Sequence, residues 1–283
     1  MNSQTLNIEL KSSNRSFRYG DGLFETMKMV DGEILFFDQH LARLQKGMQI
    51  LKMSPFEGGK GDAPSPLGEG WGAGLKNIVL QTSQQNKHSH SCKIRLQVYR
   101  DGVGEGYIPN TNDAQYTIET TALANKNYEL NQIGIKLGLY AEIKKPQNIL
   151  SNLKTSNALY SVLAGIYARE QNVDDCLLVN ESGNIVEAIG SNIFIVKEKI
   201  LYTSSLDQGC LEGVMRNNVI ALAKKNNIML IEKPISIEEV KNADEVFLTS
   251  VIKGIVSVQS YEACIYDTQK YNMTKFVFEK ILF

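Results

Sequence analysis

The chain has 283 residues, of which 43% are hydrophobic and 22% are charged, and its formal net charge is −1 at pH 7. This length and composition predict a globular protein with one large domain or two ordinary domains. Because 30 basic side chains stand against 31 acidic ones, there is no overall basic field, and we expect neither nucleic acid nor an anionic membrane as a partner.

Targeting and metal-binding signals are equally sparse. The first seven residues are polar, so nothing there resembles the apolar part of a signal peptide, and no run approaches the ~20 apolar residues of a membrane helix. The four cysteines lack the close spacing of a zinc or redox motif, and the three histidines are scattered. We therefore expect a cytoplasmic protein with reduced thiols and no metal.

The first regular elements are predicted between residues 23 and 51. Residues 23–30 have the pattern of a strand, Asp31-Gly32 is a strong hairpin turn, and residues 34–37 form the expected partner strand. Asp38 is a candidate cap for a helix, because Leu41, Leu44, Met48 and Leu51 recur at helical spacing. This helix would place one apolar stripe on the sheet.

Residues 55–75 interrupt this pattern. They contain seven of the chain's 22 glycines and three of its six prolines, without an apolar period that would support a strand or a helix. We interpret them as a flexible surface insertion. Trp71 within it is either the aromatic of a ligand lid or an incidental loop residue.

Regular structure is predicted to resume after the insertion with two strands, at residues 92–100 and 115–120, the first of which alternates strictly. The polar stretch that follows is the natural place for a domain boundary. We therefore divide the chain into an N-terminal domain of residues 1–121 and a C-terminal domain of residues 129–283.

The second half also mixes helices and strands. A helix at 156–170 carries Leu159, Val162, Leu163 and Ile166 on one face. The remaining predicted elements alternate in type: strands at 176–179 and 193–196, a helix at 212–226, a strand at 228–231, a short helix at 238–240 and a strand at 245–249.

Two charged residues of this half suggest a chemistry. Lys154 directly precedes a well-patterned helix, where a lysine amine would be held rigidly enough to bind a carbonyl cofactor. Glu187 follows in a hairpin-like run and would offer a carboxylate to a pyridine nitrogen. Composition alone does not separate these residues from solvated surface charges, since Lys144 and Lys145 also stand nearby.

Five segments in order resemble the class IV, or fold type IV, family of pyridoxal phosphate aminotransferases. They are Y-G-D-G-L-F-E-T at 19–26, H-L-A-R-L at 40–44, L-K-T-S-N-A-L-Y-S-V-L-A at 153–164, V-E-A-I-G-S-N-I-F-I-V at 186–196 and L-E-G-V-M-R-N at 211–217. The resemblance covers nearly the whole chain except the insertion. It implies a mixed α/β protein with a smaller N-terminal α/β sandwich and a larger C-terminal pseudo-barrel, pyridoxal 5′-phosphate as cofactor, and a homodimer.

The family pattern also implies roles for individual residues. Lys154 would form the Schiff base with the cofactor and then move a proton between the substrate Cα and the cofactor. Glu187 would bond the pyridine nitrogen and keep it protonated, because an anion beside this nitrogen favours the cationic ring.

The cofactor phosphate would need positive charge and backbone donors. By resemblance, Arg43 supplies a guanidinium fork, and the start of a helix after Gly213 supplies N–H groups. The implied phosphate ligands are Arg43, Val214, Met215, Ser250, Val251 and Ile252. Met215 and Val251 stand where family members often carry threonine, so backbone contacts would survive there but hydroxyl contacts would not.

The reaction type rests on weaker signals. Residues 206–216 resemble the phosphate turn of 4-amino-4-deoxychorismate lyases, and residues 100–107 resemble their glycine-rich turn, with Arg100 and Tyr107 as candidate substrate contacts. Glu105 opposes this interpretation, because it stands where a lyase arginine would attract the substrate carboxylate. A plain glycine-rich hairpin remains the alternative for this turn.

The sequence therefore slightly favours 4-amino-4-deoxychorismate lyase, which would act on an aminodeoxychorismate-like substrate. The alternative is a transaminase for amino acids of the branched-chain or D-amino acid type. A non-catalytic protein that binds the cofactor is a third possibility, although simple binding would not require both Lys154 and Glu187.

Overall fold

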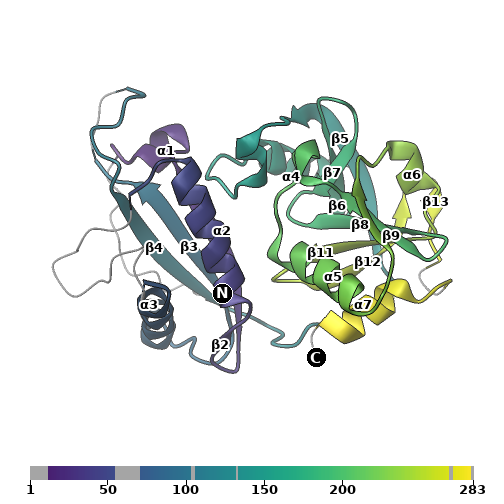
Figure 1. Ribbon diagram of the computed structural model, residues 1–283, viewed down its shortest axis with the longest axis horizontal. Helices are drawn as coiled ribbons and strands as arrows, with labels where there is room; N and C mark the ends of the chain where they lie inside the picture. The colour runs from purple at the N-terminus through teal and green to yellow at the C-terminus, as the bar shows by residue number, and fades with distance from the viewer. Residues whose placement is uncertain (1–11, 55–70, 103–105, 132, 268–269, 282–283) are drawn as a thin grey trace. The chain divides into compact units, whose positions relative to one another are not determined.

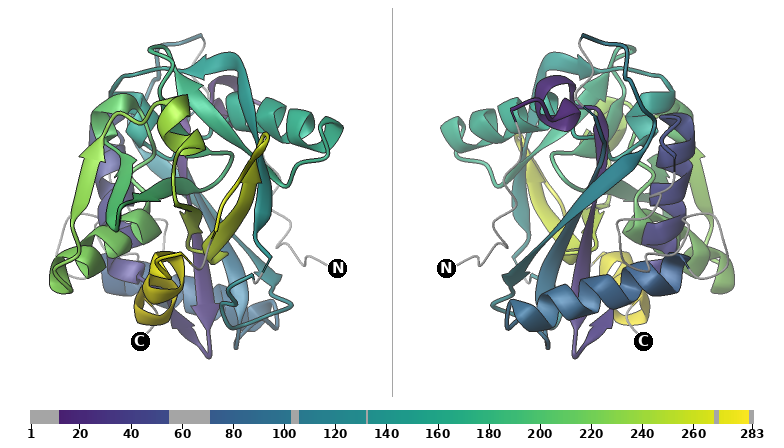
Figure 2. Two further views of the ribbon diagram at one scale, coloured as in Figure 1. Left: turned by 90° about the vertical axis from the view of Figure 1, so that its right-hand side faces the viewer. Right: turned by 90° about the vertical axis from the view of Figure 1, so that its left-hand side faces the viewer.

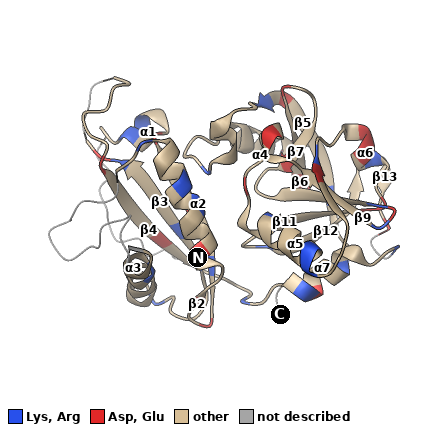
Figure 3. Ribbon diagram, in the orientation of Figure 1, with Lys and Arg blue, Asp and Glu red and all other residues tan. Residues whose placement is uncertain are grey.

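A computed structural model describes residues 12–54, 71–102, 106–131, 133–267 and 270–281. The chain divides into two compact units: residues 1–127 with 153–157, and residues 128–152 with 158–283. We propose that these units are the two domains. The short segment Leu153–Asn157 belongs to the first unit, whereas the sequence placed it in the C-terminal domain. Basic and acidic residues are interspersed along the elements of both units (Figure 3).

The first unit is built on an antiparallel sheet with the strand order β2-β1-β3-β4 (Figure 1). Its strands are β1 (Gly22–Val30), β2 (Glu33–Ile34), β3 (Cys92–Arg100) and β4 (Ala114–Ala122). The predicted alternation of β3 is confirmed, because every second residue from Cys92 to Arg100 is buried. Side chains of consecutive strand residues point to opposite faces of a sheet, so this pattern means that β3 turns one face toward the core.

Helices α2 (Phe37–Ile50) and α3 (Trp71–Gln85) cover that face of the sheet, and a short helix, α1 (Arg15–Tyr19), precedes β1. Leu44 and Met48 of α2 and Val79 of α3 share one hydrophobic core with Met27 and Ile94 of the sheet. Figure 2 shows these helices and strands from two further sides. The predicted apolar stripe of α2 is thus buried as expected.

The interpretation of residues 55–75 as an insertion without regular structure is wrong at its C-terminal end. Helix α3 begins at Trp71, and its residues Leu75 and Val79 are 4% and 0% exposed. The glycines at 72 and 74 masked this start, because they lower helix propensity but do not prevent a helix that is held by core packing. Residues 55–70 lie outside the described residues.

The second unit contains a mixed sheet in the order β10-β9-β8-β11-β12-β5-β6-β7, with β13 paired to β12. The strand bounds are β5 (Ile135–Lys145), β6 (Asp175–Asn180), β7 (Ile185–Ala188), β8 (Asn192–Lys197), β9 (Ile200–Ser204), β10 (Leu230–Lys233), β11 (Glu245–Ser250), β12 (Gly254–Tyr261) and β13 (Cys264–Ile265). The β12–β5, β5–β6 and β10–β9 pairs are parallel. The sequence missed β5, β7, β9 and β12.

This sheet curls until its two ends meet. Ile185 of the edge strand β7 forms a bridge with Ile235, which follows β10 at the opposite edge. The Ile185 N–H donates to the Ile235 carbonyl at 2.8 Å. The predicted pseudo-barrel is therefore confirmed, and its interior holds Leu177, Ile193 and Val246, which are all fully buried.

Helices and short 3₁₀ turns surround the curled sheet. They are η1 (Ile149–Asn152), α4 (Leu159–Glu170), η2 (Leu206–Gln208), α5 (Val214–Lys225), α6 (Ile237–Lys241) and α7 (Met273–Ile281). Helix α4 starts three residues later than predicted, so Lys154 lies on an extended segment before it. No helix of the described residues is both long enough and apolar enough to cross a membrane.

The first turn of α7 depends on a buried carboxylate of β11. Glu245 is 0% exposed and accepts hydrogen bonds from the backbone N–H groups of Tyr271, Met273 and Thr274, and from the Thr274 hydroxyl. Glu245→Ala should therefore lower the free energy of unfolding by at least about 3 kcal/mol, because several buried donors lose their acceptor. Chemical denaturation measures this loss. The matched control is Glu279→Ala on the exposed side of α7, which should change stability by less than about 0.5 kcal/mol; equal effects would contradict the assignment.

Candidate active site

Two of the motifs found in the sequence converge on the backbone of Leu211 in the second unit. The Leu211 N–H donates to Glu187 Oε2 at 2.7 Å. The Leu211 carbonyl accepts from the Asn192 side-chain amide at 2.8 Å. Glu187 and Asn192 belong to one predicted motif and Leu211 begins another, so the fold joins two segments that are about 20 residues apart in the sequence.

Asn192 also connects the segment around Leu211 to the predicted phosphate-ligand segment at residues 250–252. In the β8–β11 ladder Asn192 pairs with Thr249, the residue before Ser250. On its other side, a Cβ added to Gly213 would lie 1.9 Å from Asn192 Oδ1. Only glycine fits this close approach. The predicted ligand segments 213–215 and 250–252 are therefore brought together around Asn192.

The donors expected for a phosphate are present in this unit. Gly213 is the N-cap of α5, and Val214 and Met215 are the first two helical residues. The first N–H groups of a helix have no intrahelical acceptor, and they lie at the positive end of its dipole. Beside them, the buried Thr249 hydroxyl has no hydrogen-bond partner among the described residues. This donor set fits an anion such as a phosphate group.

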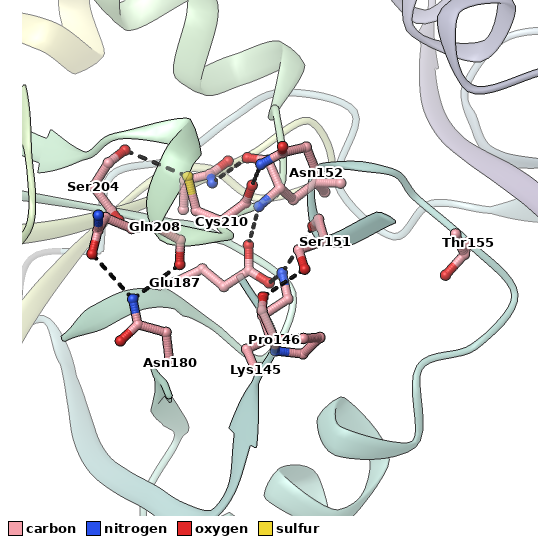
Figure 4. A network of polar contacts seen from close by, with 12 residues as sticks. Lys145, Pro146, Ser151, Asn152, Thr155, Asn180, Glu187, Ser204, Gln208 and Cys210 are labelled. Atoms are coloured by element: carbon pink, nitrogen blue, oxygen red, sulfur yellow. Dashed lines mark hydrogen bonds and ion pairs between the residues drawn. The ribbon is translucent and has the colours of Figure 1, made fainter. Parts of the chain in front are cut away.

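Glu187 is paired with a lysine that the sequence did not single out. Lys145 Nζ lies 2.5 Å from Glu187 Oε1, and the two side chains are 2% and 9% exposed (Figure 4). Lys145 Nζ also donates to the Ser151 carbonyl at 3.2 Å. Burial opposes the charge of Lys145, but the Glu187 carboxylate outweighs burial and raises the pKa of the lysine. Lys145 therefore stays protonated, which makes it a poor nucleophile.

Lys154 occupies a different setting in the first unit. Its segment pairs with β1 through a Leu23–Thr155 bridge, and the Lys154 carbonyl accepts from the Phe24 N–H at 2.8 Å. The side chain is half-buried, with Nζ 4.4 Å from the centre of the Phe24 ring. Both ends of the segment are anchored, because Gln97 Nε2 also donates to Ser156 Oγ at 2.6 Å.

Arg43 forms an ion pair with a buried carboxylate of the first unit. Its guanidinium bonds both oxygens of Glu25 at 2.8 and 2.5 Å, and His40 Nδ1 lies 2.7 Å from the same carboxylate. Glu25 follows Phe24 in β1, so its side chain points to the opposite face of the strand from the ring that Lys154 contacts. The carboxylate that binds Arg43 and the ring that Lys154 contacts therefore lie on opposite faces of β1.

The Glu25 cluster predicts a specific pH dependence. Burial would raise the pKa of Glu25, but the Arg43 guanidinium and the His40 ring lower it from 4.5 to about 2. A lowered folded-state pKa gives stability that is complete above the unfolded pKa and is lost as the pH falls toward the folded one. Glu25→Gln should thus cost roughly 3 kcal/mol at pH 6, and its difference from the unchanged protein should shrink between about pH 4.5 and pH 2. Denaturant titrations across this range test it.

The matched control for this experiment is Glu33→Gln, which neutralises an exposed carboxylate at the other end of the same hairpin. It should change the free energy of unfolding by less than about 0.5 kcal/mol at each pH. If Glu25→Gln lowers the free energy of unfolding by the same amount from pH 6 to pH 2, the ionised carboxylate is not the source of the stability.

Arg100, a candidate substrate contact, is buried in a hydrogen-bond network of the first unit. It is 6% exposed, and its donors reach the Asp21 carboxylate, the Asn112 side chain and the carbonyls of Leu51 and Lys52. The sequence placed it in the site because the turn after β3 resembled a lyase turn. Its partners come from distant parts of the chain, so the sequence did not reveal them.

Arg15, which the sequence did not single out, anchors the turn after β3. Arg15 bonds Asp21 and donates to the carbonyls of Gly106 and Tyr107. The Tyr107 side chain is 87% exposed, and its ring lies 5.5 Å from that of Tyr19. Glu105 lies outside the described residues. A capped helix start, with Asn14 accepting from the Phe17 N–H, was the available signal for α1.

Comparison with known proteins identifies the family. The model of the class IV aminotransferases matches residues 22–261. The chain belongs to this family. Its members are enzymes that use pyridoxal 5′-phosphate, so the enzyme class and cofactor expected from the resemblance are confirmed. The buried Glu187 carboxylate and the donor set around α5 fit such a cofactor.

Relatives of this class IV aminotransferase carry different activities in their names. A Methanocaldococcus jannaschii protein named "Putative branched-chain-amino-acid aminotransferase" is 33% identical over 241 residues, which cover 85% of this chain and 78% of the relative. The aminodeoxychorismate lyase of Vibrio harveyi is 24% identical over 251 residues, with 88% and 86% covered. The family is thus shown, but the reaction type is not resolved.

Solved structures support the fold. The branched-chain aminotransferase of Thermoproteus uzoniensis, crystallised with norvaline, superimposes with a TM-score of 0.81. It is 23% identical in sequence, and the match covers 97% of this chain and 89% of the archaeal one. This likeness confirms the predicted mixed α/β architecture of fold type IV enzymes.

Proposed function

We propose that this class IV enzyme is an amino acid transaminase that acts at the substrate Cα. The observation that carries the proposal is the buried carboxylate of Glu187, which is held by the Leu211 N–H and Lys145. When bound, pyridoxal 5′-phosphate supplies an electron-withdrawing ring that stabilises negative charge at Cα. Glu187 would bond the ring nitrogen and keep it protonated.

The other residues of the site divide the remaining tasks. Lys154 would bind the cofactor covalently and, once released by the substrate amine, would move the proton from Cα to the cofactor. The backbone N–H groups of Val214 and Met215 would hold the phosphate at the start of α5. Ser250 with the amides of Val251 and Ile252 would complete this cup. We also propose Arg43 as a phosphate ligand, in addition to its ion pair with Glu25.

Two findings favour transamination over the lyase reaction. The similarity to the M. jannaschii relative is greater than that to the V. harveyi lyase, at 33% against 24% identity. In addition, Arg100 donates four hydrogen bonds to Asp21, Asn112 and backbone carbonyls, which weakens the case for it as a lyase substrate contact. Tyr107 and Glu105 remain candidate substrate contacts.

The lyase stays as a second candidate for one reason. The turn L-D-Q-G-C-L-E-G-V-M-R at 206–216 resembles the lyase form of the phosphate turn, and it is the turn that contacts Glu187 through Leu211. In the lyase reaction, removal of a proton from the substrate would lead to release of pyruvate and 4-aminobenzoate instead of a keto acid.

A substrate panel decides between the two reactions. The purified protein with pyridoxal 5′-phosphate receives L- and D-amino acids with 2-oxoglutarate, and separately receives aminodeoxychorismate without an acceptor. Acceptor-dependent formation of keto acids would support the transaminase. Release of 4-aminobenzoate and pyruvate without an acceptor would replace it with the lyase, and activity with neither would refute the proposed function.

We further propose a homodimer in the cytoplasm. The apolar face predicted for α4 points to the surface, where Leu159 and Val162 are 68% and 55% exposed, while Ala164 and Ala168 face the sheet. Ile149 and Leu150 of η1 add to the exposed apolar residues. Such residues gather where a partner covers them.

The state of the cysteines supports the proposed cytoplasmic location. The four cysteines are unpaired, as is usual in reducing compartments.

The oligomeric state tests the α4 face. Val162→Glu should shift the protein from dimer to monomer in light scattering, because a carboxylate would be buried in an apolar contact. Glu170→Gln, at the exposed end of the same helix, should leave the dimer intact. If the wild-type protein is itself a monomer in light scattering, the proposed dimer is contradicted.

A further inference from the structure

The pairing of Lys145 with Glu187 has a consequence for the cofactor. Both side chains are almost completely buried, and their charged groups lie 2.5 Å apart. Each side chain also forms a hydrogen bond with the backbone: Lys145 donates to the Ser151 carbonyl, and Glu187 accepts from the Leu211 N–H. The carboxylate that would face the ring nitrogen is therefore already compensated by a cation.

The surroundings of Lys145 leave Glu187 as its counter-ion. The ionisable groups that face the ammonium are Glu187 of β7, Tyr160 of α4 and the thiol of Cys210. Nζ lies 5.5 Å from the centre of the Tyr160 ring. Burial raises the pKa of Tyr160 and raises the pKa of Cys210 to about 11, so both groups are neutral near pH 7. Without Lys145, the hydrogen bond that the described residues still offer the buried carboxylate is the one from the Leu211 N–H.

We propose that Lys145 is a positioning residue that orients the Glu187 carboxylate and balances its charge before the cofactor binds, and that the lysine's charge then opposes protonation of the cofactor's ring nitrogen. The inference rests on the proposed role of Glu187. The protonated ring nitrogen would be attracted by Glu187 but repelled by the Lys145 ammonium, so it is favoured less than it would be beside Glu187 alone. Lys145 thus sets how strongly Glu187 keeps the ring cationic.

This role predicts an energetic coupling between Lys145 and the cofactor. In the cofactor-free protein, removal of the ammonium leaves a buried charge uncompensated, which destabilises the fold. In the loaded protein, the protonated ring nitrogen takes over part of the compensation. The variant should therefore lose more stability without the cofactor than with it. An ion pair with a purely structural role would lose the same amount in both states.

Ring binding without the covalent bond is the cleanest readout. Pyridoxamine 5′-phosphate carries the same ring and phosphate but no aldehyde, so it reports on Glu187 without the lysine linkage. Lys145→Met should lower the melting temperature of the cofactor-free protein. Addition of pyridoxamine 5′-phosphate should then raise the melting temperature of this variant more than that of the wild-type protein. The dissociation constant for pyridoxamine 5′-phosphate should fall on the order of tenfold. Lys145→Gln, which also lacks the charge, gives the same test if the methionine variant does not fold.

Two control variants separate charge from shape. Lys145→Arg keeps the charge and should bind pyridoxamine 5′-phosphate like the unchanged protein. Lys144→Met neutralises the adjacent exposed lysine and should change neither quantity. Equal loss of stability in the free and loaded forms of Lys145→Met, with unchanged or weaker binding, would overturn the inference.

A Glu187→Gln variant distinguishes this failure from failure of the proposed function. If Glu187→Gln changes the affinity for pyridoxamine 5′-phosphate and its dependence on pH but Lys145→Met does not, only the inference about Lys145 is wrong. If Glu187→Gln changes neither, the carboxylate does not face the ring nitrogen and both proposals are refuted.

Discussion

Lys154→Ala is expected to lower turnover by about 10²- to 10⁴-fold, the range that a positioned general base contributes, and to remove the yellow absorbance of the covalently bound cofactor. The physical reason is the difference between Lys154 and the buried lysine that contacts Glu187. Lys145 is locked to Glu187 in a buried ion pair that keeps it protonated. Lys154 is only half-buried and lies over an aromatic ring.

The matched control is Lys144→Ala. Lys144 is exposed, so its loss should leave turnover within about twofold, as for a surface substitution away from the site. Absorbance spectra and steady-state kinetics of both variants make the comparison. Retained absorbance and turnover in Lys154→Ala would show that another residue binds the cofactor, and the assignment would have to be abandoned.

Glu187→Gln is expected to lower turnover on the order of 10²- to 10³-fold, as removal of one preorganised electrostatic contact does in other enzymes. The amide keeps the size of the side chain and can still form a hydrogen bond, so cofactor binding should suffer less than turnover. A neutral amide does not hold a proton on the ring nitrogen, and negative charge at Cα is then stabilised less. The effect should therefore appear in kcat more than in cofactor affinity.

Stability must be separated from chemistry in this variant, because Glu187→Gln leaves the buried Lys145 without its counter-ion. Combining it with Lys145→Met removes both charges and should restore much of the lost stability, since replacing a whole buried pair is tolerated better than breaking it. Turnover should remain low in the double variant. The control Glu181→Gln changes an exposed carboxylate before the same strand, and it should behave like the unchanged protein. Unchanged turnover in Glu187→Gln would remove the carboxylate from the mechanism.

Local pattern predicted much of the fold. Strand β3 was predicted with the bounds that it has, because strict alternation over nine residues has one interpretation. The helix at Phe37–Ile50 followed from its apolar spacing. The same spacing misled for α4, where Leu159 and Val162 lie at the surface. Periodicity shows that a helix has an apolar face, but it does not show what covers that face.

The site was predictable where motifs carry it and not where distant residues complete it. Glu187 and the start of α5 were found from their motifs. Their junction at Leu211 depends on a backbone N–H group, which every non-proline residue has and which no sequence pattern marks. Lys145 looked like its exposed neighbour Lys144, since only the fold of β5 buries one of the two.

The most direct test of the account is to locate the covalently bound cofactor. The purified protein is loaded with pyridoxal 5′-phosphate and treated with borohydride, which makes the bond between lysine and cofactor permanent, and peptide mass spectrometry then identifies the modified residue. The account predicts a phosphopyridoxyl group on Lys154 and none on Lys145. Modification of Lys145, or of no single lysine, would contradict it.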